Sequence, residues 1–158
     1  MGESQPNYLR RHEVDEEAAA KIQRRWQKFQ EHLGYTDEEL AVYRADPKRA
    51  KTVEDSPNLV KYNAVIEVIE AKNCGAGYKV GDKFLVDPEG CLILEECPPR
   101  ICISAVWAFK PLVSRMWQAF YDGNTEIFQD TVRCPDVGVH RGGWGEITMR
   151  ISAVPRKK

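Results

Sequence analysis

Hydrophobic residues between positions 16 and 33 recur every three or four residues, which predicts an amphipathic helix. Ile22, Trp26 and Phe29 lie on its apolar face, and Lys and Arg side chains occupy the other face. Gly34 is a residue type that commonly ends helices. Residues 1–15 show no sustained period, and we expect them to form a flexible lead-in.

A second, shorter helix is predicted after Gly34. Thr36 and Glu39 have the spacing of a capping box, and Pro47 is expected to end the helix. The charged segment from Asp46 to Pro57 is interpreted as a linker. We therefore expect residues 16–57 to form a helical arm and residues 58–158 to form a separate domain.

After Pro57 the hydrophobic period changes to two, which is typical of β-strands. Strands are predicted at residues 62–69, 79–86, 91–94 and 145–153, and a Gly-Asp turn or bulge at Gly81 and Asp82 is expected to interrupt the second of them. The most apolar stretch, residues 101–121, predicts a central helix that Pro111 either kinks or divides into two abutting helices. The expected fold class is α+β: a helical arm, then a small, mostly antiparallel sheet packed on a central kinked apolar helix.

Charge and composition limit the function classes. The chain has 23 Lys and Arg against 24 Asp and Glu, a net charge of -1, which argues against a strongly basic nucleic-acid-binding surface. No apolar run approaches the roughly 18 residues of a membrane span, and no secretory signal is visible in the first thirty residues. We expect a cytoplasmic protein that binds neither nucleic acid nor membrane.

Five cysteines, all in the second half of the chain, are the first candidates for chemistry. An odd number without a signal peptide argues against a disulfide framework. Cys91 and Cys102 lie inside apolar runs and are expected to be core residues. Cys74, Cys97 and Cys134 adjoin Gly or Pro and are therefore predicted on turns, where thiols from distant segments can converge on a metal ion or an iron–sulfur centre. Core packing is an equally simple interpretation of these three thiols.

The segment from Cys134 to Gly145 is the second candidate, because it combines a thiol, a carboxylate, an imidazole and several glycines. Cys134 as nucleophile, His140 as base and Asp136 as orienting group would form a triad-like arrangement. Arg141, Gly142, Gly143 and Trp144 are the candidate ligand-binding residues, since a glycine backbone can pass close to a ligand. The alternative interpretation is a glycine-rich turn before the last strand.

Three motifs occur in a recognisable order: Cys74-x-x-Gly-x-Lys-Val-Gly-Asp, Cys97-Pro, and Cys134-Pro-Asp. In these motifs the chain resembles a family of small bacterial and archaeal proteins without an established activity. The resemblance covers residues 62 to 151 and implies a common fold unit and matching cysteines rather than a reaction. The chain departs from the family pattern by lacking proline after Cys74 and by inserting the glycine loop from Val139 to Trp144.

The leading functional hypothesis is a small binding or accessory subunit with a cysteine-lined pocket for a metal ion, an iron–sulfur centre or a small ligand. One alternative is a cysteine-based enzyme with Cys134 as its nucleophile. The other is a structural partner of a larger enzyme. The predicted contact with a second copy or a partner protein is the face of the arm that carries Trp26 and Phe29.

Overall fold

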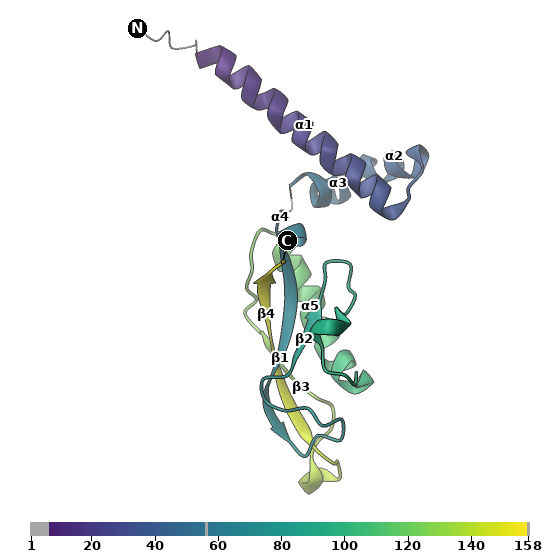
Figure 1. The fold of residues 1–158 in the computed structure, drawn as a ribbon, viewed down its shortest axis with the longest axis vertical. Coiled ribbons are helices and arrows are strands. Elements are labelled where there is room, and N and C mark those ends of the chain that lie inside the picture. Colours follow the sequence, from purple (N-terminus) through teal and green to yellow (C-terminus); the bar gives the residue numbers. More distant parts are fainter. Residues whose placement is uncertain (1–6, 56, 158) are drawn as a thin grey trace. The chain divides into compact units, whose positions relative to one another are not determined.

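The computed structural model describes residues 7–55 and 57–157, with the side chains of residues 16–55 and 58–157. It divides after Asp55 into two compact units, a helical arm and an α+β unit (Figure 1). This confirms the predicted α+β class with an N-terminal helical arm. In chain order the elements are α1 (Asn7–Leu33), α2 (Asp37–Ala45), α3 (Pro47–Glu54), α4 (Pro57–Lys61), β1 (Tyr62–Lys72), β2 (Lys83–Val86), the 3-10 helix η1 (Leu94–Glu96), α5 (Ile103–Tyr121), β3 (Thr131–Arg133), the 3-10 helix η2 (Val139–Arg141) and β4 (Glu146–Pro155).

The first helix is longer than its pattern predicts. α1 begins at Asn7, so the backbone of residues 7–15 is helical, whereas the sequence predicts a flexible lead-in there. No glycine or proline occurs in this stretch to stop a helix that the following residues favour. Residues 1–6, the rest of the predicted lead-in, lie outside the described residues.

The predicted linker is also wrong, because α3 occupies most of it. Asp46 caps this helix by accepting a hydrogen bond from the backbone N–H of Lys48 at 2.9 Å, and Pro47 follows in the first turn. Proline is well tolerated there, since its missing N–H would have no partner within the helix. The predicted cap of α2 is confirmed: the Thr36 hydroxyl accepts from Glu39 N, and the Glu39 carboxylate accepts from Thr36 N.

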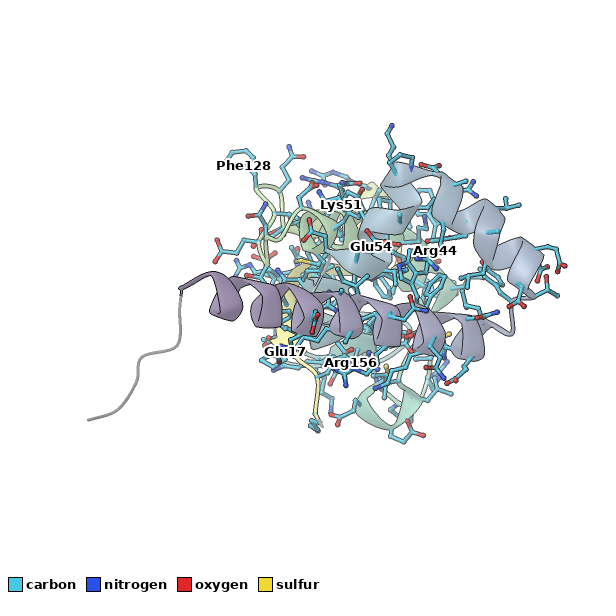
Figure 2. All side chains as sticks on the ribbon, turned by 90° about the horizontal axis from the view of Figure 1, so that it is seen from above. Glu17, Arg44, Lys51, Glu54, Phe128 and Arg156 are labelled. Carbon is cyan, nitrogen blue, oxygen red and sulfur yellow. The ribbon has the colours of Figure 1, made fainter. Side chains whose placement is uncertain are left out.

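The apolar face of α1 is covered by the other helices of the arm. The Trp26 side chain has no exposed surface, and its Nε1 donates to Glu54 Oε1 at 2.9 Å. The Arg44 guanidinium lies 4.7 Å from the centre of the same indole, and the ring of Tyr43 packs against it edge-on. Arg44 and Glu54, both labelled in Figure 2, belong to α2 and α3. The arm therefore uses its aromatic face for its own core.

The α+β unit is built on a four-stranded antiparallel sheet with strand order β2-β1-β4-β3. The longest ladder joins β1 to β4, from Tyr62 opposite Pro155 to Lys72 opposite Glu146. Alternate residues of these strands face α5 and are buried with its apolar side. The core includes Ala64, Ile66, Val68, Phe84, Phe109, Leu112, Met116, Phe120, Ile147, Met149 and Ile151.

This unit differs from the sequence prediction in several details. Residues 91–94, predicted as a strand, form only an isolated bridge between Leu92 and Val86. α5 is one continuous helix with Pro111 inside it, so there are not two abutting helices. The expected interruption at Gly81 is a turn in which this residue adopts a φ of +93°, and only the part after it, from Lys83, is a strand. The edge strand β3 was not predicted, since a three-residue strand carries no readable alternation. None of the described helices has the length and apolar character needed to cross a membrane.

Candidate functional site

Three cysteines line one cavity of about 490 Å³ at one end of the sheet. Cys74 follows β1, Cys102 immediately precedes α5, and Cys134 follows β3. We call this cavity the thiol pocket. Its other walls come from the turn after Cys74, the first turn of α5 and the start of β4, and include Gly75, Ala76, Ser104, Pro135, Asp136, Trp144, Gly145, Glu146 and Ile147.

Strand pairing explains why these distant segments meet. Lys72, the last residue of β1, pairs with Glu146, the first residue of β4, so the turn that carries Cys74 lies beside the start of β4. β3 pairs with β4 on its other side, and the ladder continues as Cys134 N donates to Ile147 O at 3.0 Å. The thiol pocket therefore forms where both ladders end.

Tyr78 attaches the third segment, the start of α5, to the same end. Its side chain is only 5% exposed, and its hydroxyl donates to Arg100 O at 2.9 Å while accepting from Cys102 N at 2.7 Å. Burial raises the pKa of Tyr78, and the hydrogen bond from Cys102 acts in the opposite direction. The neutral hydroxyl therefore holds the backbone of Cys102 in place.

Asp136 organises the loop between β3 and β4. Its Oδ1 accepts from Gly138 N and from Trp144 N, both at 3.0 Å, and its Oδ2 accepts from Gly145 N at 3.1 Å. These backbone N–H groups, led by Gly138, lower the pKa of Asp136 and favour the carboxylate. The carboxylate is thus engaged by the loop backbone rather than directed at His140, the role predicted for it in a triad.

Of the three predicted catalytic residues, Cys134 and Asp136 line the thiol pocket together, and His140 does not. Cys134 lines the thiol pocket, whereas His140 lies on η2 and lines a neighbouring cavity. Burial is the largest cause that raises the pKa of the Cys134 thiol. A hydrogen bond with the Asp136 backbone opposes it, and the nearby Cys102, Asp136 and Cys74 add smaller increases. The protonated thiol is favoured, which is the less nucleophilic form of cysteine.

Of the three predicted metal ligands, Cys74 and Cys134 share the thiol pocket and Cys97 does not line it. The Cys97 sulfur instead accepts from Leu85 N at 3.4 Å and donates to Leu85 O at 3.8 Å, which ties the turn before Pro98 to β2. Burial is the main cause that raises the pKa of the Cys97 thiol. Cys97 is therefore placed to support the fold.

Cys102 takes the place in the pocket that the sequence assigned to Cys97. It is half-buried and contacts the core, but it also faces the cavity as the residue that precedes α5. Its position just before a predicted helix start was the signal available in the sequence. Cys91, predicted in the core, is exposed. Among the side chains of residues 16–55 and 58–157, no three His, Cys, Asp or Glu groups lie closely enough together to hold a metal ion as they stand.

A second cavity, of about 290 Å³, adjoins the first. Trp144, Gly145 and Glu146 line both cavities, and Lys72, His140 and Arg141 line the second alone. We call it the basic pocket. Two of the four predicted ligand-binding residues, Arg141 and Trp144, belong to its wall.

The other two predicted ligand-binding residues, Gly142 and Gly143, do not line either cavity. Gly142 has a φ of +84° and ends η2, a conformation that L side chains rarely adopt. A Cβ on Gly143 would overlap the Asp136 carboxylate. Both glycines therefore shape the loop around Asp136 rather than form a wall for a ligand.

Comparison of the chain with protein-family models, with curated proteins and with solved structures finds no match. The resemblance in the three cysteine motifs accordingly stays a prediction.

Proposed function

We propose that the α+β unit binds a soft metal ion through the thiolates of Cys74, Cys102 and Cys134. The observation that supports this proposal is the convergence of three thiols from three separate segments on one cavity. Thiolates are the ligands that select soft ions such as Cu(I) and Zn(II) over hard cations. Three converging thiols also favour a single ion over an iron–sulfur cluster, which is usually held by four cysteines.

The electrostatics of the pocket link ion binding to loss of the thiol protons. Without an ion, burial is the main cause that raises the pKa of Cys134, and Cys102 and Cys74 add to it because neighbouring thiolates would repel one another. A bound cation reverses this effect, since a coordinating thiol loses its proton. The N-terminal end of α5 also lies at the pocket, and the helix dipole favours the net negative charge of three thiolates around one ion.

Binding requires the sulfur atoms to turn toward one point, because the described side chains do not form a finished coordination group. The backbone segments that carry two of them are already fixed, by Tyr78 at Cys102 and by the β3–β4 ladder at Cys134. Rotation about the Cα–Cβ bonds is therefore the movement that the proposal needs. Three thiolates leave a fourth position of a tetrahedral ion open for another ligand.

Titration of the reduced, full-length protein with Cd²⁺ tests the proposal, because cadmium–thiolate bonds absorb in the ultraviolet. We expect one cadmium ion per chain. Serine replacement of Cys74, Cys102 or Cys134 should weaken cadmium binding at least about tenfold. Changing residues that only support metal ligands already lowers metal affinity by about this factor. Cys91→Ser is the matched control, because Cys91 is exposed and outside the pocket.

Two results would overturn the metal proposal. One is a wild-type protein that shows no thiolate–cadmium absorbance. The other is an equal loss of binding in Cys91→Ser and in the pocket variants, which would indicate nonspecific thiol capture. Circular dichroism of each variant shows whether the fold is retained.

The proposal includes a cytoplasmic location, where thiols stay reduced, and assembly with a second copy or a partner through the arm. A partner would have to use surface other than Trp26, since that indole is fully buried within the arm. Val42 of α2, which is 67% exposed, belongs to such a surface. Light scattering of the full-length protein tests self-assembly, and a monomer at all concentrations would remove it.

A further inference from the structure

The basic pocket gathers positive charge from two separate parts of the α+β unit. Lys72 comes from the end of β1, and His140 and Arg141 come from η2. Their side chains make no hydrogen bond or ion pair with any of the residues that the structure describes. Groups of this kind are available to bind a ligand.

The acidic groups nearby are engaged elsewhere. Glu146 is the acid in the wall of the basic pocket; it stands opposite Lys72 in the β1–β4 register, and its carboxylate forms an ion pair with Arg133 of β3. The Asp136 carboxylate accepts its hydrogen bonds from the loop backbone. The pocket therefore keeps a net positive charge from Lys72 and Arg141.

Trp144 is the largest of the three residues that line both pockets, and it is 79% exposed. It lies over the turn after β1, where a Cβ on Gly75 would be 3.6 Å from the ring. Below it, the Asn73 carbonyl approaches Gly145 so closely that a Cβ on Gly145 would overlap it. The two pockets are thus neighbours that share Trp144, Gly145 and Glu146 in their walls.

We infer that the basic pocket binds the carboxylate or phosphate group of a small organic ligand whose other end reaches the thiol pocket past Trp144. Lys72 and Arg141 supply the positive charge, and the guanidinium can bind either acid group through paired N–H donors. The link between the pockets rests on the proposed function, because a three-thiolate ion leaves one position open for the far end of the ligand. Binding of the acid group itself does not depend on a metal ion.

Inorganic phosphate and succinate are the probes for the acid site, titrated separately into metal-free, full-length protein at low ionic strength. The signal is the change in tryptophan fluorescence on binding. The part of this change that is lost in Trp144→Phe is assigned to Trp144. We expect saturable binding of at least one probe, weakened at least about fivefold by Lys72→Gln and by Arg141→Gln, consistent with the loss of one charge-assisted hydrogen bond. Saturation by phosphate alone or by succinate alone identifies the acid group of the ligand.

Lys79→Gln and Arg115→Gln are the matched controls, since both residues are exposed and neither lines the basic pocket. The inference is overturned if neither probe binds, or if the controls weaken binding as much as the pocket variants do. Because this titration uses no metal, its failure is separate from failure of the cadmium titration. A protein that binds phosphate but no cadmium would keep the acid site and lose the proposed metal site.

The link between the pockets needs its own measurement, on cadmium-loaded protein. Mercaptosuccinate and mercaptoethanol both offer a thiolate to the ion, but mercaptosuccinate also carries carboxylates. We expect mercaptosuccinate to bind at least about tenfold more tightly, as expected when two contacts act together, and Arg141→Gln to abolish the difference. Equal affinities in the wild-type protein would overturn the link.

Discussion

Replacing Tyr78 with phenylalanine tests whether one hydroxyl holds the start of α5 at the thiol pocket. The change removes two hydrogen bonds, to Arg100 O at 2.9 Å and from Cys102 N at 2.7 Å. It leaves the ring, which packs edge-on against Phe84 with the centroids 5.2 Å apart. Because the side chain is 5% exposed, water cannot readily replace the lost partner.

The expected cost follows from these contacts. Each hydrogen bond contributes about 0.5–1.5 kcal/mol net, so losing two should lower the free energy of unfolding by about 2 kcal/mol. With a urea dependence of about 2 kcal/mol per molar, the unfolding midpoint of the α+β unit should fall by about 1 M.

Pulsed alkylation of cysteines in urea, read by mass spectrometry, measures this unit alone, because all five cysteines follow residue 57. Tyr62→Phe is the matched control: it removes the same group, and the Tyr62 hydroxyl makes no hydrogen bond with the described residues. A midpoint for Tyr78→Phe within about 0.3 M of the wild type, or equal shifts in both variants, would refute the reasoning, since about 1 M is expected.

Three other predictions concern stability. The pKa of Tyr78 in the native state lies above the ordinary tyrosine value of about 10. The free energy of unfolding should therefore fall as the pH rises from about 10 to the higher native pKa. Tyr78→Phe should reduce this fall, measured as the urea midpoint against pH. Trp26→Ala should destabilise the arm by about 3–5 kcal/mol, seen as early loss of helical circular dichroism with the alkylation midpoint unchanged. Gly145→Ala should lower the alkylation midpoint by more than Gly77→Ala does. The alanine Cβ at position 145 would overlap the Asn73 carbonyl, whereas at position 77 there is open space and the only cost is the positive φ. The first prediction is contradicted if Tyr78→Phe leaves the pH dependence of the midpoint unchanged. The second is contradicted if the arm of Trp26→Ala stays as stable as that of the wild type, and the third if the two glycine variants lower the midpoint equally.

Local signals in the sequence predicted the elements that depend on local interactions. The capping box of Thr36 and Glu39 placed the start of α2 correctly, and the alternation around Ile66 and Ile147 identified the two long strands. Pro47 was misread because proline stops one helix and starts another equally well, and only the cap by Asp46 distinguishes the two. Aspartate is a common helix N-cap, but Asp46 alone does not indicate that a helix follows it.

The composition of the thiol pocket could not be predicted in the same way. The sequence shows that Cys74, Cys97 and Cys134 adjoin turn-forming residues, but it does not show which turns meet. That is decided by the β1–β4 register and by the Tyr78 hydroxyl, which holds the backbone of Cys102. Both involve residues far apart in the chain, whose pairing no local pattern encodes.

The β1–β4 ladder also determines when the site can exist during folding. Even its pair closest in sequence joins Lys72 to Glu146, so a long loop must close before this ladder forms, and such closure is slow compared with the local contacts of helices. During synthesis, Cys74, Cys102 and Cys134 leave the ribosome in order but cannot share a cavity until β4 has followed them. A nascent chain therefore presents separate thiols, and the three-thiol pocket belongs only to the finished fold.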